Sequence, residues 1–336
     1  MTAQEKATGW LAQFDATLRR GDAAGAAELF IPDSYWRDLL SFTWNLKTAE
    51  GKDQIRNMLE QTLPHVHPSN WKIDGEAAEA NGIIEAWFTF ETAKARGKGL
   101  LRLKEGKAWT LLTTMVELKG HEEAKGETRP KGVEHGTHKG RKTWLESREE
   151  EARSLGYTQQ PHVVIIGGGQ AGIILGARLR KLGVPAIIIE KNARAGDSWR
   201  NRYKSLCLHD PVWYDHLPYM PFPEDWPVFA PKDKVGDWLE MYTKVMELNY
   251  WNSTTCKKAH YNEARGEWEV TVEREGREVT LKPKELVIAL GVSGYPNVPK
   301  IDGADSFLGD QFHSSKFPGA ENYRGKKAVV LGLSLI

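Results

Sequence analysis

The sequence predicts an α+β domain followed by an α/β domain with a parallel sheet. In residues 1–119, apolar residues recur first at helical spacing and then in strand-like runs. In residues 157–325, a short β-branched run leads directly into a glycine-rich turn and a helix. Residues 120–156 form a charged linker and a helix between the two domains, and residues 326–336 begin a further strand. The length of 336 residues also favours about two domains.

Composition and charge are typical of a globular protein and argue against several partners. Hydrophobic residues make up 40% of the chain and charged residues 27%. The net charge is +1, so we expect no nucleic-acid partner. The apolar runs are too short or too interrupted for a membrane span, and the N-terminus lacks the apolar core of a signal peptide. Two cysteines, Cys207 and Cys256, show no metal or redox spacing, so we expect a cytoplasmic protein without a metal.

The first domain is predicted to wrap a curved antiparallel sheet around helices. Four apolar residues ahead of Gly21 lie at helical spacing: Trp10, Leu11, Phe14 and Leu18. Two further helices are predicted at residues 23–30 and at residues 52–63, the second closed by Pro64. Three strands follow: residues 82–91, 99–104 and 107–118, the last two joined by the turn Glu105-Gly106.

The aromatic segment at residues 34–44 (SYWRDLLSFTW), within this order of elements, resembles the SnoaL-like cone-shaped domains of the nuclear-transport-factor type. Such domains have a pocket at the mouth of the cone. The resemblance implies that Tyr35, Trp36, Asp38 and Trp44 line it. The alternative is that the aromatic rings pack in the core and Asp38 is a surface or capping group. Cone domains often form dimers, so the resemblance also implies a possible homodimer.

A helix is predicted just before the second domain. Residues 120–142 are rich in glycine and charge, which is typical of a flexible connection. Thr143 and Glu146 then form a T-x-x-E capping box, which marks a helix start, and Gly156 marks its end. We expect this helix to dock on the second domain.

A glycine motif organises the second domain. Residues 162–166 form the apolar run of a buried parallel strand. Gly167, Gly169 and Gly172 then occupy the three glycine positions of G-x-G-x-x-G. The first glycine allows a tight turn, the second lets the backbone approach a pyrophosphate, and the third lets helix and strand pack closely.

The helix and acidic residue after the motif complete a Rossmann-like dinucleotide unit. The helix N-terminus offers free N–H groups to a pyrophosphate. Its inner side is predicted to carry four aliphatic residues: Ile174, Leu175, Leu179 and Leu182. Gly183 stands at the position of a left-handed helix cap, and a strand at residues 184–189 leads to Glu190. Glu190 is placed to accept hydrogen bonds from an adenosine ribose, although the motif alone does not distinguish FAD from NAD.

The residues after Glu190 resemble those of flavin-containing monooxygenases, a family of class B flavoprotein monooxygenases. Residues 195–203 (AGDSWRNRY) resemble the G-x-x-W-R-x-x-Y region of that class. Residues 220–227 (MPFPEDWP) resemble the P-F-P-E-D block, and residues 285–291 (ELVIALG) the strand that closes the FAD half. Residues 307–317 (FLGDQFHSSKF) fit the fingerprint F-x-G-x-x-x-H-x-x-x-[YF] of flavin-containing monooxygenases.

Two positions indicate a subtype of this family. Phe317 stands where Baeyer–Villiger enzymes carry tryptophan. Residues 206–211 (LCLHDP) resemble the L-x-L-H-x-P segment of YUCCA-type enzymes, with His209 where animal enzymes place an asparagine near the flavin. His209 therefore either faces the flavin or nicotinamide, or is a histidine fixed by backbone hydrogen bonds.

The resemblance implies an FAD-dependent monooxygenase that uses NADPH and O2. In the family, NADPH reduces the flavin, O2 forms a flavin C4a-hydroperoxide, and one oxygen passes to a small nucleophilic or carbonyl substrate. No side-chain nucleophile is required. The aromatic keto acids on which YUCCA-type enzymes act are the substrate class that the LCLHDP segment suggests.

The same resemblance implies which residues contact the cofactors. The FAD pyrophosphate contacts are the six residues of the motif: Gly167, Gly168, Gly169, Gln170, Ala171 and Gly172. Glu190 contacts the ribose, and Ser198 and Trp199 lie beside the flavin. Leu208 and His209 lie near the flavin–nicotinamide contact, with His209 the candidate catalytic residue. Four fingerprint residues are implied to be structural: Phe307, Gly309, His313 and Phe317.

The C-terminal residues depart from the family pattern. Residues 326–331 (KKAVVL) and Gly332 look like the start of the NADPH-binding unit, but Ser334 stands where glycine is required. We interpret the chain as a C-terminally truncated member, in which hydride transfer from NADPH is expected to be absent or very slow. The alternatives are a catalytically inactive FAD-binding or ligand-binding protein, and a flavin-linked reductase, against which the fingerprint argues.

Overall fold

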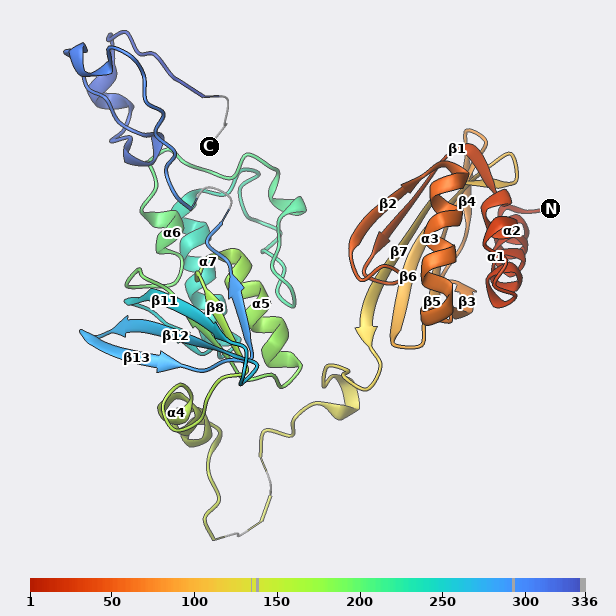
Figure 1. The fold of residues 1–336 in the computed structure, drawn as a ribbon, viewed down its shortest axis with the longest axis horizontal. Coiled ribbons are helices and arrows are strands. Elements are labelled where there is room, and N and C mark those ends of the chain that lie inside the picture. The colour runs from red at the N-terminus through yellow and green to blue at the C-terminus, as the bar shows by residue number, and fades with distance from the viewer. Residues whose placement is uncertain (134, 137–138, 292–293, 333–336) are drawn as a thin grey trace. The chain divides into compact units, whose positions relative to one another are not determined.

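The computed structural model describes residues 1–133, 135–136, 139–291 and 294–332. The chain divides into two compact units, Met1–Glu123 and Ala124–Ile336 (Figure 1). Within the described residues, no helix has both the length and the apolar character needed to cross a bilayer.

The first unit contains three helices: α1 (Ala3–Arg19), α2 (Ala23–Glu28) and α3 (Gly51–Val66). The predicted apolar face of α1 is confirmed, because it buries Trp10, Leu11, Phe14 and Leu18. The prediction that Pro64 closes α3 is wrong, since the helix continues to Val66. A proline in the last turn removes one backbone donor, and the remaining hydrogen bonds of that turn suffice to continue it.

The sheet of the first unit has seven strands: β1 (Phe30–Leu39), β2 (Leu46–Glu50), β3 (Ser69–Ile73), β4 (Ala78–Ala80), β5 (Ile83–Glu91), β6 (Ala95–Lys104) and β7 (Lys107–Leu118). Their order is β2-β1-β7-β6-β5-β3, and β4 pairs with β5. The expectation of an antiparallel sheet is corrected at one place, because β1 and β7 pair in parallel. Parallel neighbours need a long crossover, and the chain from β2 to β6, with α3, supplies it.

Aromatic side chains fill the space between this sheet and its helices. Figure 1 shows α3 lying across one face of the sheet. The buried rings come from both layers: Trp10, Phe14, Phe30, Trp36, Phe42, Phe88 and Phe90. The structure therefore places Trp36 in the core, whereas the side chains of Tyr35 and Trp44 are exposed.

Asp38 is also buried, and its carboxylate organises the loop after β1. It accepts hydrogen bonds from the backbone N–H groups of Phe42 and Thr43, at 2.9–3.2 Å. It also accepts from the hydroxyls of Thr43 and Thr113, at 2.8 and 2.7 Å. This buried carboxylate is satisfied by the protein itself, as the capping alternative for Asp38 supposes.

We expect Gly99→Ala to destabilise the first unit by about 2 kcal/mol, because overpacking a core has costs of that order. An added Cβ would lie 2.2 Å from Cζ of Phe88 and 2.3 Å from the carbonyl oxygen of Leu112. The Phe88 ring is fully buried and cannot move aside. The matched control is Gly9→Ala in α1, where a Cβ meets nothing within 4 Å and should stabilise the helix by about 1 kcal/mol.

Urea unfolding, monitored by hydrogen exchange in peptides from the first unit, measures the free energy of unfolding of both variants. Equal stability of Gly99→Ala and the unmodified chain would contradict this account of the packing at β6.

The second unit contains a four-stranded parallel sheet: β8 (Val163–Ile166), β9 (Ala186–Ile189), β10 (Tyr250–Trp251) and β14 (Glu285–Ile288), in the order β10-β9-β8-β14. Three of the helices in this unit are α5 (Gln170–Lys181), α6 (Asp197–Arg200) and α7 (Lys232–Val245). Three antiparallel strands form a separate sheet: β11 (Thr254–Asn262), β12 (Glu267–Arg274) and β13 (Arg277–Leu281). The fold is thus mixed, with an α/β second unit.

Alternate residues of the parallel sheet face different layers. Val164 and Ile187 share a core with Val270 and Val272 of β12, so the antiparallel sheet covers one face. The other face carries a second cluster with Ile165, against which residues of α5 pack.

Three of the four aliphatic residues predicted for the inner side of α5 pack against buried clusters: Ile174, Leu175 and Leu179. Leu182 follows the helix and is exposed, and the prediction missed Ile173 and Ala177, which are fully buried. The helix approaches β9 closely at Gly176, where an added Cβ would lie 2.6 Å from Cδ1 of Ile188. The predicted cap is confirmed, since Gly183 adopts a φ of 69°.

The helix α4 (Trp144–Ser154) lies on the second unit, as expected. Its capping box of Thr143 and Glu146 is present. The Glu151 carboxylate accepts hydrogen bonds from Arg180 at 3.0 Å and Asn249 at 2.7 Å, and it forms an ion pair with Arg148. These contacts attach α4 to the end of α5 and to the residue before β10.

We expect the attachment of α4 to weaken as the pH falls below about 4. Burial opposes ionisation of Glu151, but the hydrogen bonds from Asn249 and Arg180 outweigh it and hold the pKa of this carboxyl below its ordinary value. The contribution to stability is therefore complete above the ordinary pKa and is lost as the pH falls through the lowered one. Amide exchange in α4 between pH 3 and 7 measures the effect.

The controls for this pH dependence are two glutamine variants on the same helix. Glu151→Gln should remove the pH dependence of α4 exchange. Glu149→Gln should retain it, because Glu149 contacts only the exposed Arg153, at 3.8 Å, on the described surface. An unchanged pH profile in Glu151→Gln would contradict the assignment.

The C-terminal part of the second unit differs from the prediction. The strand expected at residues 326–331 is not formed, and Val329 and Val330 are exposed. A strand requires a neighbour for its hydrogen bonds, and no described strand pairs with this segment. Ser334 lies outside the described residues.

The short 3-10 segments of the second unit, among the described residues, are η1 (Gly126–Thr128), η2 (Val212–Tyr214), η3 (Ala304–Ser306), η4 (Ser314–Lys316) and η5 (Ala320–Tyr323).

Candidate dinucleotide-binding site

The turn between β8 and α5 requires glycine at two positions of the motif. Gly167 has a φ of 111°, which favours glycine, and an added Cβ would lie 2.3 Å from the carbonyl oxygen of Ala289. At Gly172 an added Cβ would lie 2.0 Å from the carbonyl oxygen of Gly167. These contacts give the tight turn and the close packing of helix on strand that the spacing predicts.

Gly169 has a different environment, which matches its predicted role. Its backbone is extended, with φ −75° and ψ −173°. An added Cβ would meet only Oγ of Ser198, at 4.0 Å. The side of Gly169 that a side chain would occupy is therefore open, as the close approach of a phosphate group requires.

The first turn of α5 keeps its N–H groups available. Gly169 is the N-cap, and no side chain caps the helix there. The N–H groups at Gln170, Ala171 and Gly172 precede the first intrahelical donor, Ile173, which bonds the Gly169 carbonyl at 3.0 Å. Together with the helix dipole, these N–H groups could hold an anion at the open side of Gly169.

Glu190 lies at the end of β9 and is buried. Its Oε2 accepts from the Gly168 N–H at 2.9 Å. Its Oε1 accepts from the backbone N–H of Asn192 at 2.8 Å and from the Asn192 side-chain amide at 2.7 Å. A carboxylate has about four acceptor positions, so one on Oε2 remains for a ligand hydroxyl. The N–H of Gly168 donates to Glu190. Among the six residues predicted to contact the pyrophosphate, Gly168 therefore does not have its own N–H available as a donor.

Tyr250 of β10 contacts the glycine turn at Gly168. Its hydroxyl donates a hydrogen bond to the Gly168 carbonyl at 2.7 Å. Burial raises the pKa of Tyr250 far above its ordinary value, and the nearby carboxylates of Glu190 and Asp197 raise it further. The phenol is therefore a neutral donor at any physiological pH.

The helix α6 brings Ser198 and Trp199 to the same turn. The indole N–H of Trp199 donates to the side-chain oxygen of Gln170 at 3.1 Å. The helix approaches α7 closely at two glycines, because a Cβ on Gly196 would lie 2.1 Å from the carbonyl oxygen of Gly236. Two residues assigned to the flavin from the sequence thus lie at the N-terminus of α5.

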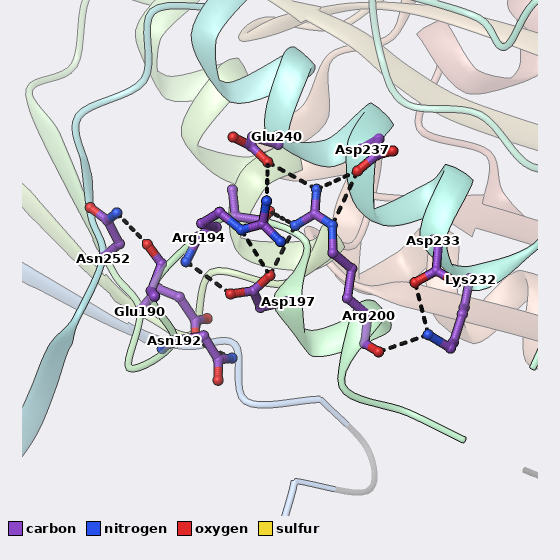
Figure 2. Close-up of polar contacts among 12 residues, drawn as sticks. Glu190, Asn192, Arg194, Asp197, Arg200, Lys232, Asp233, Asp237, Glu240 and Asn252 are labelled. Carbon is purple, nitrogen blue, oxygen red and sulfur yellow. Dashed lines mark hydrogen bonds and ion pairs between the residues drawn. The ribbon is translucent and has the colours of Figure 1, made fainter. Parts of the chain in front are cut away.

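A network of charged side chains fixes α6 against α7 (Figure 2). Arg200 has a side-chain exposure of only 10%. Its guanidinium donates to Asp197 at 3.0 Å, to Asp237 at 2.8 Å and to Glu240 at 2.9 Å. Burial lowers the pKa of Arg200, but these carboxylates outweigh it and raise that pKa overall. Figure 2 shows that Arg194 and Arg200 both direct their guanidinium groups toward Asp197 and Glu240.

Leu208 and His209 differ in their surroundings. Leu208 is partly buried in the apolar cluster that also includes Trp199, and its N–H bonds the Ala230 carbonyl at 2.9 Å. The His209 side chain is 89% exposed and lies 3.6 Å from the carboxylate of Asp210. The structure thus brings Leu208 toward the Trp199 side of the site and leaves the His209 ring on the surface.

The fingerprint residues at 307–317 lie in an irregular segment. Phe317 packs edge-on against Tyr203, with ring centroids 6.3 Å apart, and also contacts Phe312. His313 accepts a hydrogen bond from the Ser315 N–H at 3.1 Å. Phe307 is 61% exposed. The contact with Tyr203 connects this segment to the residues that follow α6.

Sequence reasoning missed three groups that shape the site. Tyr250 and Asn192 hold the glycine turn and Glu190, and Arg200 holds α6. The only signal for Asn192 was its position two residues after Glu190. Tyr250 belongs to a two-residue strand, which is too short for any periodicity to reveal.

Comparisons with known proteins identify a family and several similar proteins. Residues 162–335 match the family described as flavin-binding monooxygenase-like. Indole-3-pyruvate monooxygenase YUCCA1 from Oryza sativa subsp. japonica is 35% identical over 176 residues, which cover 52% of this chain and 43% of that protein.

Two solved structures are also similar. A flavin-containing monooxygenase from Stenotrophomonas maltophilia is 26% identical, with a TM-score of 0.45, and the match covers 49% of this chain and 48% of that one. OTEMO in complex with FAD and NADP is 26% identical, with a TM-score of 0.39, over 48% of this chain and 31% of that one. The chain spans less than half the length of each of these three proteins.

Proposed function

Because the chain belongs to the flavin-binding monooxygenase-like family, we propose that its second unit binds FAD as part of a monooxygenase. The observation that carries the proposal is the pairing of an uncapped helix N-terminus at Gly169 with the Glu190 carboxylate, joined through the Gly168 N–H at 2.9 Å. The helix N-terminus suits a pyrophosphate and the carboxylate suits a ribose diol, and both groups belong to the ADP portion of a dinucleotide.

We assign the pyrophosphate to the open side of Gly169 and to the N–H groups of Gln170, Ala171 and Gly172. Glu190 takes a ribose hydroxyl on its remaining acceptor position. A 2′-phosphate at this place would meet the negative charge of Glu190, so the site favours FAD over NADPH. Ser198 and Trp199 continue the site along α6 toward the flavin, and Leu208 lies on the same side.

Bound FAD supplies the redox chemistry, accepting a hydride from NADPH and activating O2 for oxygen transfer to a small nucleophilic or carbonyl substrate. The residues of this chain bind and orient it. Leu208 and Trp199 exclude water from one side through the apolar cluster they share. We assign His209 to the edge where flavin and nicotinamide meet, since its side chain is exposed to any group bound there.

The substrate class to test first is a 2-oxo acid with an aromatic side chain. The support is the name of the relative YUCCA1, an indole-3-pyruvate monooxygenase, and the LCLHDP segment around His209. We also propose that the first unit has a cone-shaped fold and that its role is to form a dimer contact.

The experiment that tests the proposal is a visible absorption spectrum of the purified chain, with flavin released by heat and quantified. About one FAD per chain, with FMN and NADP absent from the released cofactor, is the expected result. NADPH oxidation with and without the 2-oxo acid then tests the reaction. A chain that neither contains nor takes up FAD would overturn the assignment. FAD binding without NADPH oxidation would instead support a catalytically inactive FAD-binding protein.

A further inference from the structure

We propose that Tyr250 is a positioning residue of the dinucleotide site, holding the Gly168 carbonyl so that the next N–H group faces the pyrophosphate. The inference rests on the proposed FAD site. It concerns a residue that lies 82 positions beyond Gly168 in the chain and outside the strand–turn–helix unit itself.

The first step is the contact between Tyr250 and the turn. The hydroxyl lies 2.7 Å from the Gly168 carbonyl oxygen. An added Cβ at Gly168 would lie 2.1 Å from that hydroxyl and 2.8 Å from Cβ of Glu190. Gly168 is not one of the three glycines that the motif requires. The tyrosine therefore explains why this position is glycine as well.

The second step is the direction of the peptide groups. In a trans peptide the carbonyl and the following N–H point in opposite directions. With the Gly168 carbonyl held by Tyr250, the Gly169 N–H points away from β10, toward the open side of the turn. The Gly168 N–H is itself held by Glu190 at 2.9 Å. Gly168 is thus fixed on both sides, and the donors that remain face the ligand.

The third step is the rigidity of the tyrosine. Tyr250 pairs with Ile188 and Trp251 pairs with Ile189 in the parallel sheet. Trp251 is buried in the core with Ile187. The phenol stays protonated, because burial raises its pKa. The sheet therefore presents a fixed neutral donor to the turn, which prepares the loop before any ligand binds.

The test is Tyr250→Phe in the full chain, with FAD and ADP as separate probes. ADP contains the ribose and pyrophosphate without the flavin. We expect the Kd of both to rise by about tenfold, because a hydrogen bond to a buried carbonyl is lost and the loop loses its fixed geometry. A rise for FAD alone would place Tyr250 at the flavin and overturn the proposal.

The matched control is Tyr242→Phe. Tyr242 is also buried in the second unit, and its hydroxyl donates to a backbone carbonyl, that of Pro218, at 2.8 Å. It should cost comparable stability and leave both Kd values unchanged. An equal loss of affinity in the two variants would show only a general loss of stability and would contradict positioning.

Amide exchange in residues 167–172 of the ligand-free chain separates this inference from the proposed function. Tyr250→Phe should speed exchange at the Gly168 amide at least fivefold, and Tyr242→Phe should not. If the unmodified chain binds neither probe, the FAD assignment fails while the exchange result still decides whether Tyr250 fixes the turn. Unchanged exchange together with unchanged Kd values would overturn the inference.

Discussion

Gly169→Ala is expected to weaken FAD binding by about 100-fold while the second unit remains folded. A Cβ at this position meets nothing nearer than Oγ of Ser198 at 4.0 Å, and the backbone conformation is one that alanine adopts. The change in folding stability should therefore stay below about 1 kcal/mol. The added methyl group would occupy the open side of the turn, where we place the pyrophosphate. Overlap with a tightly held group costs about 3 kcal/mol, which corresponds to that loss of affinity.

The control for this prediction is the same substitution three residues later. Gly172→Ala places a Cβ 2.0 Å from a backbone oxygen, which cannot move without opening the turn. This variant should lose about 3 kcal/mol of stability in the second unit. Fluorescence titration with FAD and hydrogen exchange of residues 162–190 measure both variants. If Gly169→Ala binds FAD as tightly as the unmodified chain does, the pyrophosphate is not where we place it.

Two glycines of the motif, Gly167 and Gly172, show why the glycine turn was predictable from sequence. A positive φ at Gly167 and a backbone contact at Gly172 exclude every other residue type, so the requirement is recorded directly in the chain. The capping box at Thr143 and Glu146 is similar, because both of its hydrogen bonds are local. Local constraints of this kind can be read without knowing the tertiary fold.

The features that were missed depend on contacts between distant residues. The parallel pairing of β1 with β7 depends on which strands meet, and nothing in either strand encodes the partner. The close approach of α5 to the sheet depends on the contact between Gly176 and Ile188. Tyr250 reaches Gly168 only because β10 pairs with β9. Predicting each of them requires the sheet order first, which sequence periodicity does not contain.

The charged network at α6 belongs to the same class of feature. The sequence predicts Trp199 and Arg200 as part of a family segment, but not that Arg200 is almost completely buried between two helices. That arrangement has a measurable consequence. We expect the position of Ser198 and Trp199 to depend partly on Arg200, because it joins α6 to α7.

Arg200→Ala is expected to destabilise the second unit by about 3 kcal/mol, because it removes the cation that contacts the buried Asp197 carboxylate most closely. Asp197 is 8% exposed and would keep only Arg194 as a charged partner, at 3.6 Å. The loss should appear first at α6, so heating should release FAD before the rest of the unit unfolds. Hydrogen exchange in residues 190–245 and the temperature of flavin release measure these effects.

The matched control is Lys244→Ala, which removes another cation from the same network. Lys244 contacts Glu240 at 3.0 Å, but its side chain is 73% exposed. An exposed pair of this kind contributes less than about 0.5 kcal/mol. Arg200→Lys should fall between the two, since an ammonium retains the charge but cannot bridge Asp237 and Glu240 as the guanidinium does. If Arg200→Ala and Lys244→Ala are equally stable, the buried network does not hold α6 in place, and Ser198 and Trp199 must be positioned by the apolar cluster alone.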